Sequence, residues 1–397
     1  MSAELRLARC HLLMTVDAVG GVWSYALDLV RGLLDRAVLD HEIRVTLAVL
    51  GPRASDAQRV EASGIAGLNL IETDLPLDWL SDSEADVKRA ANGIAKIARE
   101  IGADLVQLNG SPLSGVTSFS IPLIAVHHSC LATWWAAVKS EPLRPDWGWR
   151  VDLVARHLAT SDRVVVPSAA FGLSVTQTYG LSERPLVIHN GRSNGASIAG
   201  ADRQIEALFT AGRLWDEGKG IGTLDEAAAC LDVPVFAAGP TQGPNGARIK
   251  CRHLRLLGEL SNEIVRAWLA GRPIFVSASL YEPFGLSVLE AAQAGCALLL
   301  SDIPTFRELW KGAAILVPPH DPVAFADAAK RLFADPALRS CLADAAQQRA
   351  KSFNLTRQAR AMAELYGRVL KEKHVAPLPV SRRGARGKLT QSAGAAA

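Results

Sequence analysis

The sequence predicts an α/β protein made of two doubly wound, Rossmann-like parallel-sheet domains that face each other across a cleft. The chain has 397 residues, more than one ordinary core accommodates, so two domains of roughly 180 residues each are expected. Short apolar runs alternate with amphipathic helical patterns throughout, as in parallel sheets covered by helices on both faces. The alternation occurs twice, on either side of a turn-rich stretch at residues 186–204.

The first series begins with an apolar run at residues 10–16, a glycine-containing turn at 17–21 and an amphipathic pattern at 23–34. This order predicts a strand, a tight turn and a helix that packs on the sheet. A second amphipathic pattern, at residues 87–101, predicts another helix. Further strands of this series are expected at residues 43–50, 104–108, 121–126, 163–166 and 186–189.

The second series repeats the alternation in the other half of the chain. It predicts strands at residues 207–211, 235–238, 254–257, 274–276, 297–300 and 314–317. Helices are expected at residues 263–270, 286–294, 322–333 and 355–370. We therefore place one Rossmann-like domain at residues 1–190 and a second at 191–373, with the final helix able to pack back on the first domain.

The last residues, 374–397, are rich in proline, serine, glycine and alanine, and they include Arg382, Arg383, Arg386 and Lys388. Such a composition predicts a solvated, disordered basic tail. The alternative is an electrostatic tether to anionic lipid, which would bring the protein into peripheral contact with the inner face of the membrane.

Composition and charge exclude several function classes. Hydrophobic residues make up 49% and charged residues 21% of the chain, which is enough apolar material for two cores. A net charge of +3 without a basic stripe gives no reason to expect a nucleic-acid partner. The six cysteines are scattered without metal-ligand spacing, as in reduced cytoplasmic proteins. No apolar run approaches the roughly 20 residues that a membrane span needs.

Two glutamates eight positions apart enclose a predicted strand-to-helix turn in the second series. Glu282 is expected in the loop, and Glu290 about one turn into the helix that Gly285 begins. A helix start offers free backbone N–H groups and a positive dipole end, which suit a diphosphate. One carboxylate can then accept hydrogen bonds from sugar hydroxyls and the other from a ribose diol. The plain alternative is a helix-capping Glu282 and a solvated Glu290.

This segment, continued through residues 291–302, resembles the nucleotide-sugar-binding signature of retaining glycosyltransferases of family four, which have the GT-B fold. Residues 211–220 match the family's G-R-x-x-x-x-x-K-G element, residues 17–22 match its glycine turn, and residues 125–127 match its strand-end histidine. The resemblance covers nearly the whole chain. Four matches in the right order are much more specific than any one of them.

The resemblance implies a cytoplasmic, metal-independent hexosyltransferase that retains anomeric configuration. Its donor would be a nucleotide-diphosphate sugar bound to the C-terminal domain, and its acceptor a glycan, lipid or small molecule bound to the N-terminal domain. No cofactor and no metal are expected. The resemblance also implies front-face attack in which the departing phosphate takes the acceptor's proton, so we name no nucleophile of the enzyme.

The expected catalytic residues are His127, Arg213, Lys219 and Glu282. Negative charge grows on the leaving phosphate as the bond to the sugar breaks, and a metal-free site must stabilise it with fixed cations and backbone donors. Arg213 offers a planar fork and Lys219 a compact charge. Ordinary surface charge at a helix start is the alternative for these two residues.

The N-terminal domain contributes a glycine turn and a histidine to the expected site. Gly20 and Gly21 would let the backbone approach the donor closely, because they carry no Cβ. His127 is expected to point from its strand end into the cleft, with His128 on the alternate face. The expected donor-binding residues are Gly20, Gly21, Arg213, Lys219, Glu282, Phe284, Gly285, Leu286 and Glu290.

Two segments depart from the family pattern. The usual N-G-[VI]-D element here reads Asn-Gly-Arg-Ser at residues 190–193, and the loop after Asp302 lacks the Gly-Gly pair that many members carry. Both departures concern the donor more than the reaction. Tryptophans at positions 134, 135, 147 and 149 form our candidate region for acceptor recognition, with local packing as the alternative.

Two other function classes compete with a transferase. One is a catalytically inactive GT-B protein that binds a glycan or a nucleotide, and the other is a nucleotide-sugar epimerase. The candidate catalytic residues are all present, which favours an active enzyme. A phosphorylase would need a pyridoxal lysine signature and a longer chain.

Overall fold

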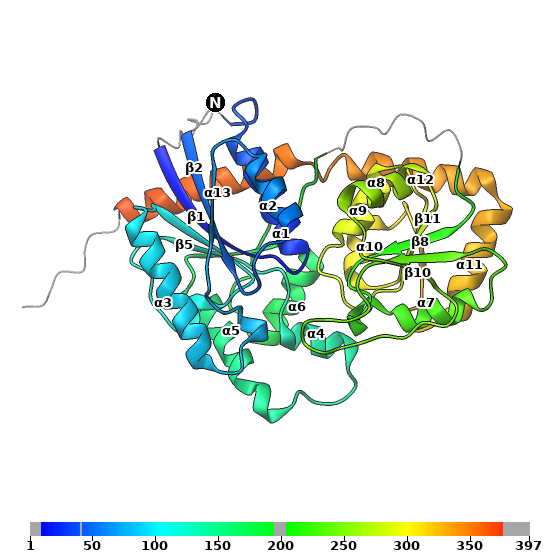
Figure 1. The fold of residues 1–397 in the computed structure, drawn as a ribbon, viewed down its shortest axis with the longest axis horizontal. Coiled ribbons are helices and arrows are strands. Elements are labelled where there is room, and N and C mark those ends of the chain that lie inside the picture. Colours follow the sequence, from blue (N-terminus) through cyan, green and yellow to red (C-terminus); the bar gives the residue numbers. More distant parts are fainter. Residues whose placement is uncertain (1–8, 40–41, 194–203, 376–397) are drawn as a thin grey trace, which may run out of the picture.

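The computed structural model describes residues 9–39, 42–193 and 204–375, which form two α/β domains lying side by side (Figure 1). Each domain contains one parallel sheet with helices on its faces. The expectation of two doubly wound parallel-sheet domains is confirmed.

The N-terminal domain contains a seven-stranded sheet in the order β3-β2-β1-β4-β5-β6-β7. Its strands are β1 (Arg9–Asp17), β2 (Glu42–Leu50), β3 (Leu68–Glu72), β4 (Leu105–Asn109), β5 (Leu123–Val126), β6 (Arg163–Val166) and β7 (Leu186–Val187). Its α-helices are α1 (Gly21–Leu34), α2 (Asp56–Ser63), α3 (Glu84–Glu100), α4 (Leu131–Val138), α5 (Gly148–Thr160) and α6 (Ala169–Tyr179). The strand order reverses direction at β1 and β4, which is the switch point where such sheets bind ligands.

The C-terminal domain contains a six-stranded sheet in the order β10-β9-β8-β11-β12-β13. Its strands are β8 (Leu208–Ala211), β9 (Val235–Ala238), β10 (Arg255–Gly258), β11 (Ile274–Ser277), β12 (Leu298–Ser301) and β13 (Ile315–Val317). Its helices are η4 (Glu217–Lys219, a 3₁₀ turn), α7 (Ile221–Ala228), α8 (Asn262–Ala270), α9 (Leu286–Gln293), α10 (Pro304–Trp310), α11 (Pro322–Ala334) and α12 (Pro336–Ala350). Here the switch point lies between β8 and β11.

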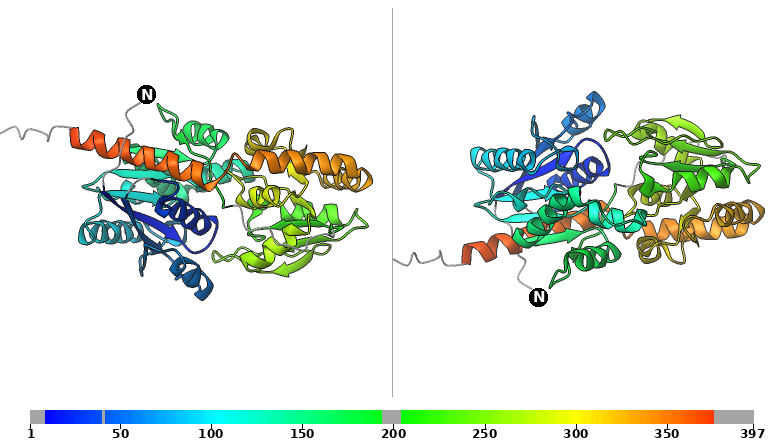
Figure 2. Two further views of the ribbon diagram at one scale, coloured as in Figure 1. Left: turned by 90° about the horizontal axis from the view of Figure 1, so that it is seen from above. Right: turned by 90° about the horizontal axis from the view of Figure 1, so that it is seen from below.

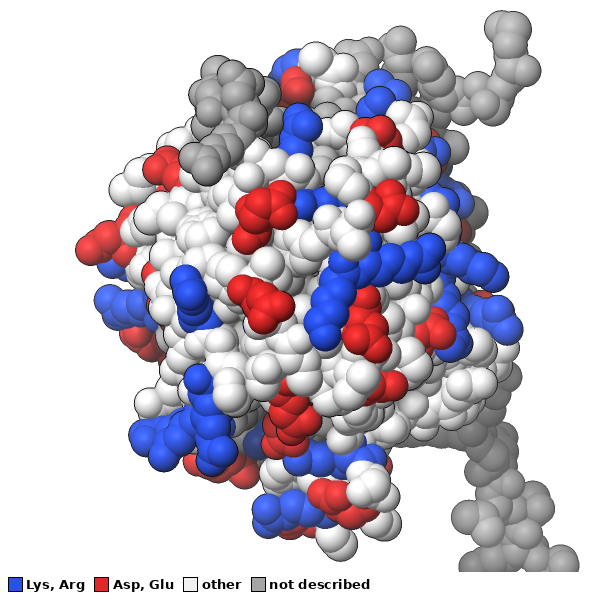
Figure 3. All heavy atoms as spheres, turned by 90° about the vertical axis from the view of Figure 1, so that its right-hand side faces the viewer, with Lys and Arg blue, Asp and Glu red and all other residues white. Residues whose placement is uncertain are grey.

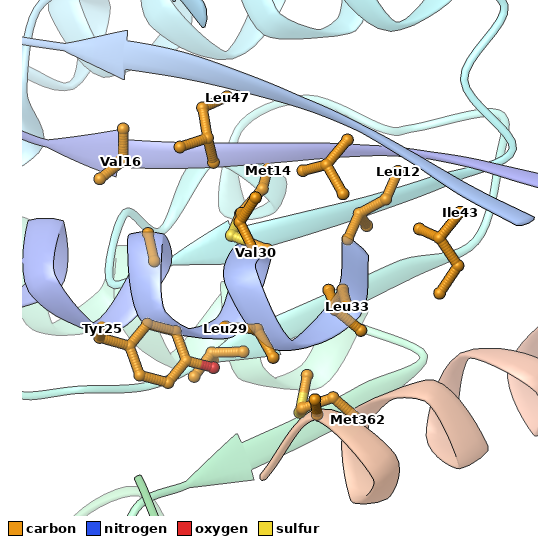
Figure 4. Packing of buried hydrophobic residues seen from close by; sticks show 14 of the residues in the cluster. Leu12, Met14, Val16, Tyr25, Leu29, Val30, Leu33, Ile43, Leu47 and Met362 are labelled. Atoms are coloured by element: carbon orange, nitrogen blue, oxygen red, sulfur yellow. The ribbon is translucent and has the colours of Figure 1, made fainter. Parts of the chain in front are cut away.

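The N-terminal core forms because β1 and α1 present apolar faces with different periods to each other. Leu12, Met14 and Val16 alternate along β1 and are buried, as the period of two requires. Leu29 and Leu33 recur at helical spacing on α1 and pack onto the same face (Figure 4).

The last helix, α13 (Leu355–Val375), follows the C-terminal domain in sequence but lies along the N-terminal domain in both views of Figure 2. Met362, Leu365, Tyr366 and Val369 are buried in the same core as α1. The side chain of Met362 points toward α1 in Figure 4. The hydroxyl of Tyr366 donates a 2.5 Å hydrogen bond to Gln107 Oε1. The chain therefore crosses between the domains twice.

Charge is mixed over the end of the C-terminal domain that faces away from the N-terminal domain. Lys and Arg side chains lie among Asp and Glu side chains there (Figure 3). The expected basic tail begins at residue 374, but α13 continues to Val375, and residues 376–397 lie outside the described residues.

Candidate functional site

A cavity of about 910 Å³ lies between the two domains. Its walls come from the loops that follow the carboxyl ends of β1, β5, β8 and β11. Eight of the nine expected donor-binding residues line it: Gly21, Arg213, Lys219, Glu282, Phe284, Gly285, Leu286 and Glu290. The two domains thus present the ends of their sheets to one shared space, as doubly wound folds do.

The turn between β11 and α9 places two carboxylates at the cavity wall. Gly285 immediately precedes α9 as its N-cap, with φ of +92°, a conformation that other residues adopt only with strain. A Cβ at this position would also lie 3.2 Å from the ring of Phe306. Glu282 precedes the glycine and Glu290 follows it within α9, and both line the cavity. The helix start between them leaves backbone N–H groups free to bind an anion.

The loop after β8 brings two cations to the same wall. Lys219 Nζ lies 2.5 Å from Glu282 Oε2, and the two side chains are 21% and 13% exposed. Arg213 Nη2 lies 2.9 Å from Asp216 Oδ2, and 42% of the arginine side chain is exposed. The acidic partners orient both cations, while Arg213 still offers much of its guanidinium to a ligand.

The loop after β8 reaches this position because Gly220 packs directly against the end of β11. Gly220 has φ of +61°, and a Cβ there would lie 2.1 Å from the carbonyl oxygen of Ala278. Only glycine permits this approach. The backbone N–H of Leu280 donates a 2.8 Å hydrogen bond to the carbonyl of Gly218. These contacts hold the lysine and the glutamate loops together.

The glycine turn of the N-terminal domain faces Arg213 across the domain boundary. A Cβ on Gly20 would lie 3.0 Å from Arg213 Nη1, and one on Gly21 would lie 3.6 Å from the side chain of Leu286. Gly20 therefore contacts the site through Arg213, although it does not itself line the cavity. Burial raises the pKa of Asp17 at the start of this turn, and the charge of Arg213 acts in the opposite direction.

His127 does not face the cavity, and the expectation that it points into the cleft is wrong. Its backbone N–H donates to the carbonyl of Val165 at 2.8 Å, so the strand alternation continues past β5. His127 is 1% exposed, and its ring stacks on Phe171 of α6 with centroids 5.6 Å apart. His128 falls on the opposite face and lines the cavity, with its ring centroid 4.3 Å from that of Tyr25.

His128 is the histidine that meets the cavity, and it is neutral. Burial, with a contribution from the adjacent His127, lowers the pKa of His128 to about 3. Its Nε2 atom is buried and has no hydrogen-bond partner among the described residues. A neutral imidazole can donate or accept a hydrogen bond, but it brings no charge to the site.

A polar cluster that the sequence did not predict joins the Glu282 loop to α4. The Tyr281 hydroxyl lies 2.9 Å from Thr133 Oγ1, and Thr133 Oγ1 lies 3.0 Å from the thiol of Cys130. Burial raises the pKa of Cys130, but His127 and the hydroxyls of Thr133 and Tyr179 outweigh this and lower it to about 7. Tyr281 and Thr133 lie 148 positions apart in the sequence, so spacing alone could not relate them.

The tryptophans of the candidate acceptor region line the N-terminal side of the cavity and also contact the C-terminal domain. Trp134 Nε1 donates a 3.0 Å hydrogen bond to Asp216 Oδ1. Trp135 Nε1 donates to the carbonyl of Glu141 at 2.7 Å, and its ring meets that of Trp147 edge-on with centroids 5.3 Å apart. The expected aromatic wall is present, and part of it serves to dock α4 on the loop after β8.

Glu290 is engaged by a residue from the segment that departs from the family pattern. Arg192 Nη2 donates to Glu290 Oε1, and Arg192 Nη1 donates a 2.6 Å hydrogen bond to Asp28 Oδ2 of α1. Opposing charges raise the pKa of Arg192, although its burial acts against them. Glu290 therefore reaches the cavity as one partner of an ion pair.

The described residues offer neither a metal site nor a membrane span. No three His, Cys, Asp or Glu side chains among them are grouped so that they could bind a metal ion. Within the same ranges, no helix is both long and apolar enough to cross a membrane.

Comparison with known proteins identifies families for both halves of the chain. Residues 19–193 match the family described as Glycosyltransferase Family 4. Residues 206–335 match the family described as Glycosyl transferases group 1. The boundary between the matches falls at the segment that joins the two domains.

Curated relatives are similar over part of their length. An alpha-D-kanosaminyltransferase of Streptomyces kanamyceticus is 28% identical over 217 residues, which are 53% of this chain and 52% of the relative. The lipopolysaccharide core mannosyltransferase LpsB of Rhizobium meliloti is 28% identical over 157 residues, covering 34% of this chain and 42% of the relative. The chain spans about half the length of the curated relatives it matches.

Solved structures resemble the whole described chain. The sucrose-phosphate synthase of Thermosynechococcus elongatus superposes with a TM-score of 0.74 at 19% identity, covering 92% of this chain and 100% of that one. The Anabaena protein HepE, solved with UDP-glucose, superposes with a TM-score of 0.69 at 18% identity, covering 91% and 100%. At these identities the similarity shows the fold alone. Together, the fold and the two family matches establish that the chain belongs to the GT-B glycosyltransferases of family 4 and group 1.

Proposed function

We propose that the protein is a metal-independent, retaining hexosyltransferase. It moves a hexose-type sugar from a nucleotide-diphosphate donor to a hydroxyl of a glycan, lipid or small-molecule acceptor. One observation carries this proposal: Arg213, Lys219, Glu282 and Glu290 line a single cavity between the domains. Their residue types match the parts of such a donor, with two cations for the diphosphate and two carboxylates for hydroxyl groups.

The diphosphate lies between the loop after β8 and the start of α9. Arg213 donates through a planar fork and Lys219 through a compact ammonium group, and the free N–H groups of α9 add uncharged donors. The carboxylates of Asp216 and Glu282 fix the two cations before the donor arrives. A preorganised site spends little free energy on reorganisation when charge develops.

Rate enhancement comes from interactions that strengthen as the bond between sugar and phosphate breaks. The leaving diphosphate gains negative charge, so Arg213 and Lys219 bind the transition state more tightly than the ground state. Each factor of ten in rate corresponds to about 1.4 kcal/mol. Two oriented cations of this kind supply several kcal/mol, and this is the role that a divalent metal would otherwise serve.

The two carboxylates recognise opposite ends of the donor. Glu282 lies in the loop nearest Lys219 and accepts hydrogen bonds from sugar hydroxyls. Glu290 lies farther along α9 and accepts from the ribose diol. Their cationic partners remove the repulsion that two free carboxylates would exert on a diphosphate.

The acceptor enters from the N-terminal side, where His128 and the tryptophans line the cavity. A neutral His128 fits a role in orienting the sugar through a hydrogen bond. In the mechanism that the family resemblance implies, the acceptor hydroxyl attacks the front face of the sugar and the leaving phosphate takes its proton. The family membership supports this mechanism. It requires no nucleophile of the enzyme.

The donor class is tested by incubating the purified protein with UDP-, GDP- and ADP-hexoses, with and without an acceptor panel. We expect release of one nucleoside diphosphate that depends on the acceptor. HepE, one of the structural neighbours, was solved with UDP-glucose, so UDP sugars are the first choice. An epimerase would convert the donor without releasing the diphosphate, and an inactive binding protein would do neither.

Metal independence and retention are tested in the same assay. Activity should persist in EDTA, and NMR of the product should show the donor's anomeric configuration. Loss of activity in EDTA with rescue by Mg²⁺ would contradict the metal-free mechanism. An inverted product would contradict retention while leaving the donor site intact.

A further inference from the structure

Arg192 belongs to one of the two segments in which this chain departs from the family pattern, and it lies at the segment between the domains. Its guanidinium donates to Asp28 of α1 in the N-terminal domain and to Glu290 of α9 in the C-terminal domain. The Arg192 side chain is only 12% exposed. It is not among the residues that line the cavity. Arg192 therefore acts on the site through Glu290.

We infer that Arg192 is a positioning residue for recognition of the donor's ribose, and that it couples this recognition to the relative position of the two domains. The inference rests on the proposed function, because it takes Glu290 as the carboxylate that accepts the ribose diol. It adds a residue that does not touch the donor and a link to the N-terminal domain.

Asp28 fixes the position of the guanidinium. The carboxylate of Asp28 is 1% exposed, and a buried charge without partners is strongly unfavourable. Arg192 supplies a 2.6 Å contact, and Arg31 of the same helix supplies another at 3.2 Å. Arg31 in turn lies 3.0 Å from Glu61 of α2. Charges of alternating sign thus run from α2 through α1 to the cavity.

The backbone around Arg192 is fixed independently of these ion pairs. The N–H of Gly191 donates to Gln358 Oε1 at 2.9 Å, and a Cβ on Gly191 would lie 2.3 Å from the carbonyl oxygen of Asn354. The N–H of Arg192 donates to the carbonyl of Phe353 at 3.2 Å. Both the backbone and the carboxylate of Asp28 therefore determine where the guanidinium lies.

Two physical effects on Glu290 follow from this arrangement. The hydrogen bond to Oε1 restricts the rotation of the carboxylate, so less conformational entropy is lost when a diol binds. The charge of Arg192 also offsets that of Glu290, which would otherwise repel the nearby diphosphate. Because Asp28 belongs to the other domain, both effects depend on the domains keeping this relative position.

The inference is tested by calorimetric titration with UDP and 2′-deoxy-UDP, or with GDP or ADP and the matching deoxy analogue where UDP does not bind. We expect the wild type to bind the ribonucleotide at least about tenfold more tightly than the deoxynucleotide, as loss of a charge-assisted hydrogen bond implies. In Arg192→Met the ratio should fall below about threefold. Arg192→Lys should restore part of it, since the charge remains but the fork is lost.

Two further variants separate positioning from loss of structure. Arg31→Met removes the other arginine on Asp28 but leaves the contact with Glu290, and it should keep the wild-type ratio. Asp28→Asn combined with Arg192→Met removes the buried charge together with its partner, so a folded protein remains for titration. Thermal melting of each variant checks that it is folded.

The outcomes distinguish this inference from the proposed function. A wild type that binds none of UDP, GDP and ADP would overturn the donor assignment itself, and the role of Arg192 with it. A wild type that discriminates against the deoxynucleotide, together with an Arg192→Met variant that does so equally, would overturn only the role of Arg192. Tighter ribonucleotide binding in Arg192→Met would show that the arginine competes with the donor, and this also contradicts positioning.

Discussion

At the scale of single residues, ion pairs hold the charged side chains that line the cavity in fixed positions. The close contact of Lys219 with Glu282 places a cation and an anion side by side at the cavity wall, where we propose that the phosphate and the sugar of one donor bind. The family resemblance led us to expect these residues in one site, and the structure shows that both loops follow neighbouring parallel strands, β8 and β11. The pairing of Glu290 with Arg192 was not predictable, since nothing in the spacing of the sequence relates positions 98 residues apart.

The first prediction concerns Lys219 and Glu282, which we propose act on the bond between sugar and phosphate. Lys219→Ala and Glu282→Ala should each lower kcat by at least about 100-fold, because each removes an oriented charge that acts in the transition state. Steady-state kinetics at saturating donor measures this, and melting temperatures check that the variants are folded. Wild-type turnover in both variants would exclude the two residues from the mechanism.

The two adjacent histidines provide a second prediction at this scale. His128→Ala should lower kcat/KM by at least about tenfold more than His127→Ala, because only His128 lines the cavity. His127→Ala should mainly lower the melting temperature, since its ring packs on Phe171. The reverse order of kinetic effects would mean that His127 meets the donor. The period of a strand predicts that neighbouring side chains face opposite ways, but it does not say which face borders a cleft.

At the scale of elements, short apolar runs predicted strands well, whereas elements without a clear apolar pattern were missed. The observed strand at 163–166 agrees residue for residue with the expected one, because three consecutive valines follow the polar stretch at residues 161–163. The edge strand β3 was not predicted, since its side chains are only partly buried and carry no continuous apolar run. Helix α12 was also missed, because its pattern has little amphipathic periodicity.

A third prediction tests how the loop after β8 is held. Gly220→Ala should lower the free energy of unfolding by more than about 1 kcal/mol and reduce activity, because the residue has positive φ and its Cβ would collide with the carbonyl of Ala278. Chemical denaturation and initial rates measure the two effects.

Gly222→Ala is the matched control, two positions away within α7. Nothing lies within 4 Å of the Cβ that this change would add. It should therefore raise stability slightly, by about 0.5–1 kcal/mol, through helix propensity. Equal effects of the two substitutions would contradict the account of the loop.

At the scale of the whole molecule, helix α13 connects the end of the chain to the first domain. We expected a helix at residues 355–370 that is able to pack back on the first domain, although amphipathic spacing alone does not say which core an apolar face joins. The structure places Met362, Tyr366 and Val369 in the same core as the apolar residues of α1. Asp28 lies on this helix. The helix thus stabilises the same element that holds Arg192.

A fourth prediction follows from this packing. Met362→Ala should cost about 2–5 kcal/mol in the free energy of unfolding, as large-to-small changes in cores do. Glu364→Ala, on the exposed face of the same helix, should change it by less than about 0.5 kcal/mol. Denaturant titration followed by tryptophan fluorescence measures both. Equal stabilities would mean that α13 is not part of the N-terminal core.

We propose that Arg213 and Lys219 of the loop after β8, Glu282 of the loop after β11 and Glu290 of α9 surround one nucleotide-diphosphate sugar. A crystal structure of the protein with UDP, or with whichever nucleoside diphosphate binds, tests it most directly. We expect diphosphate oxygens within hydrogen-bond distance of Arg213 and Lys219, and ribose hydroxyls on Glu290. A nucleotide found elsewhere, or one whose phosphates point away from both cations, would contradict the claim.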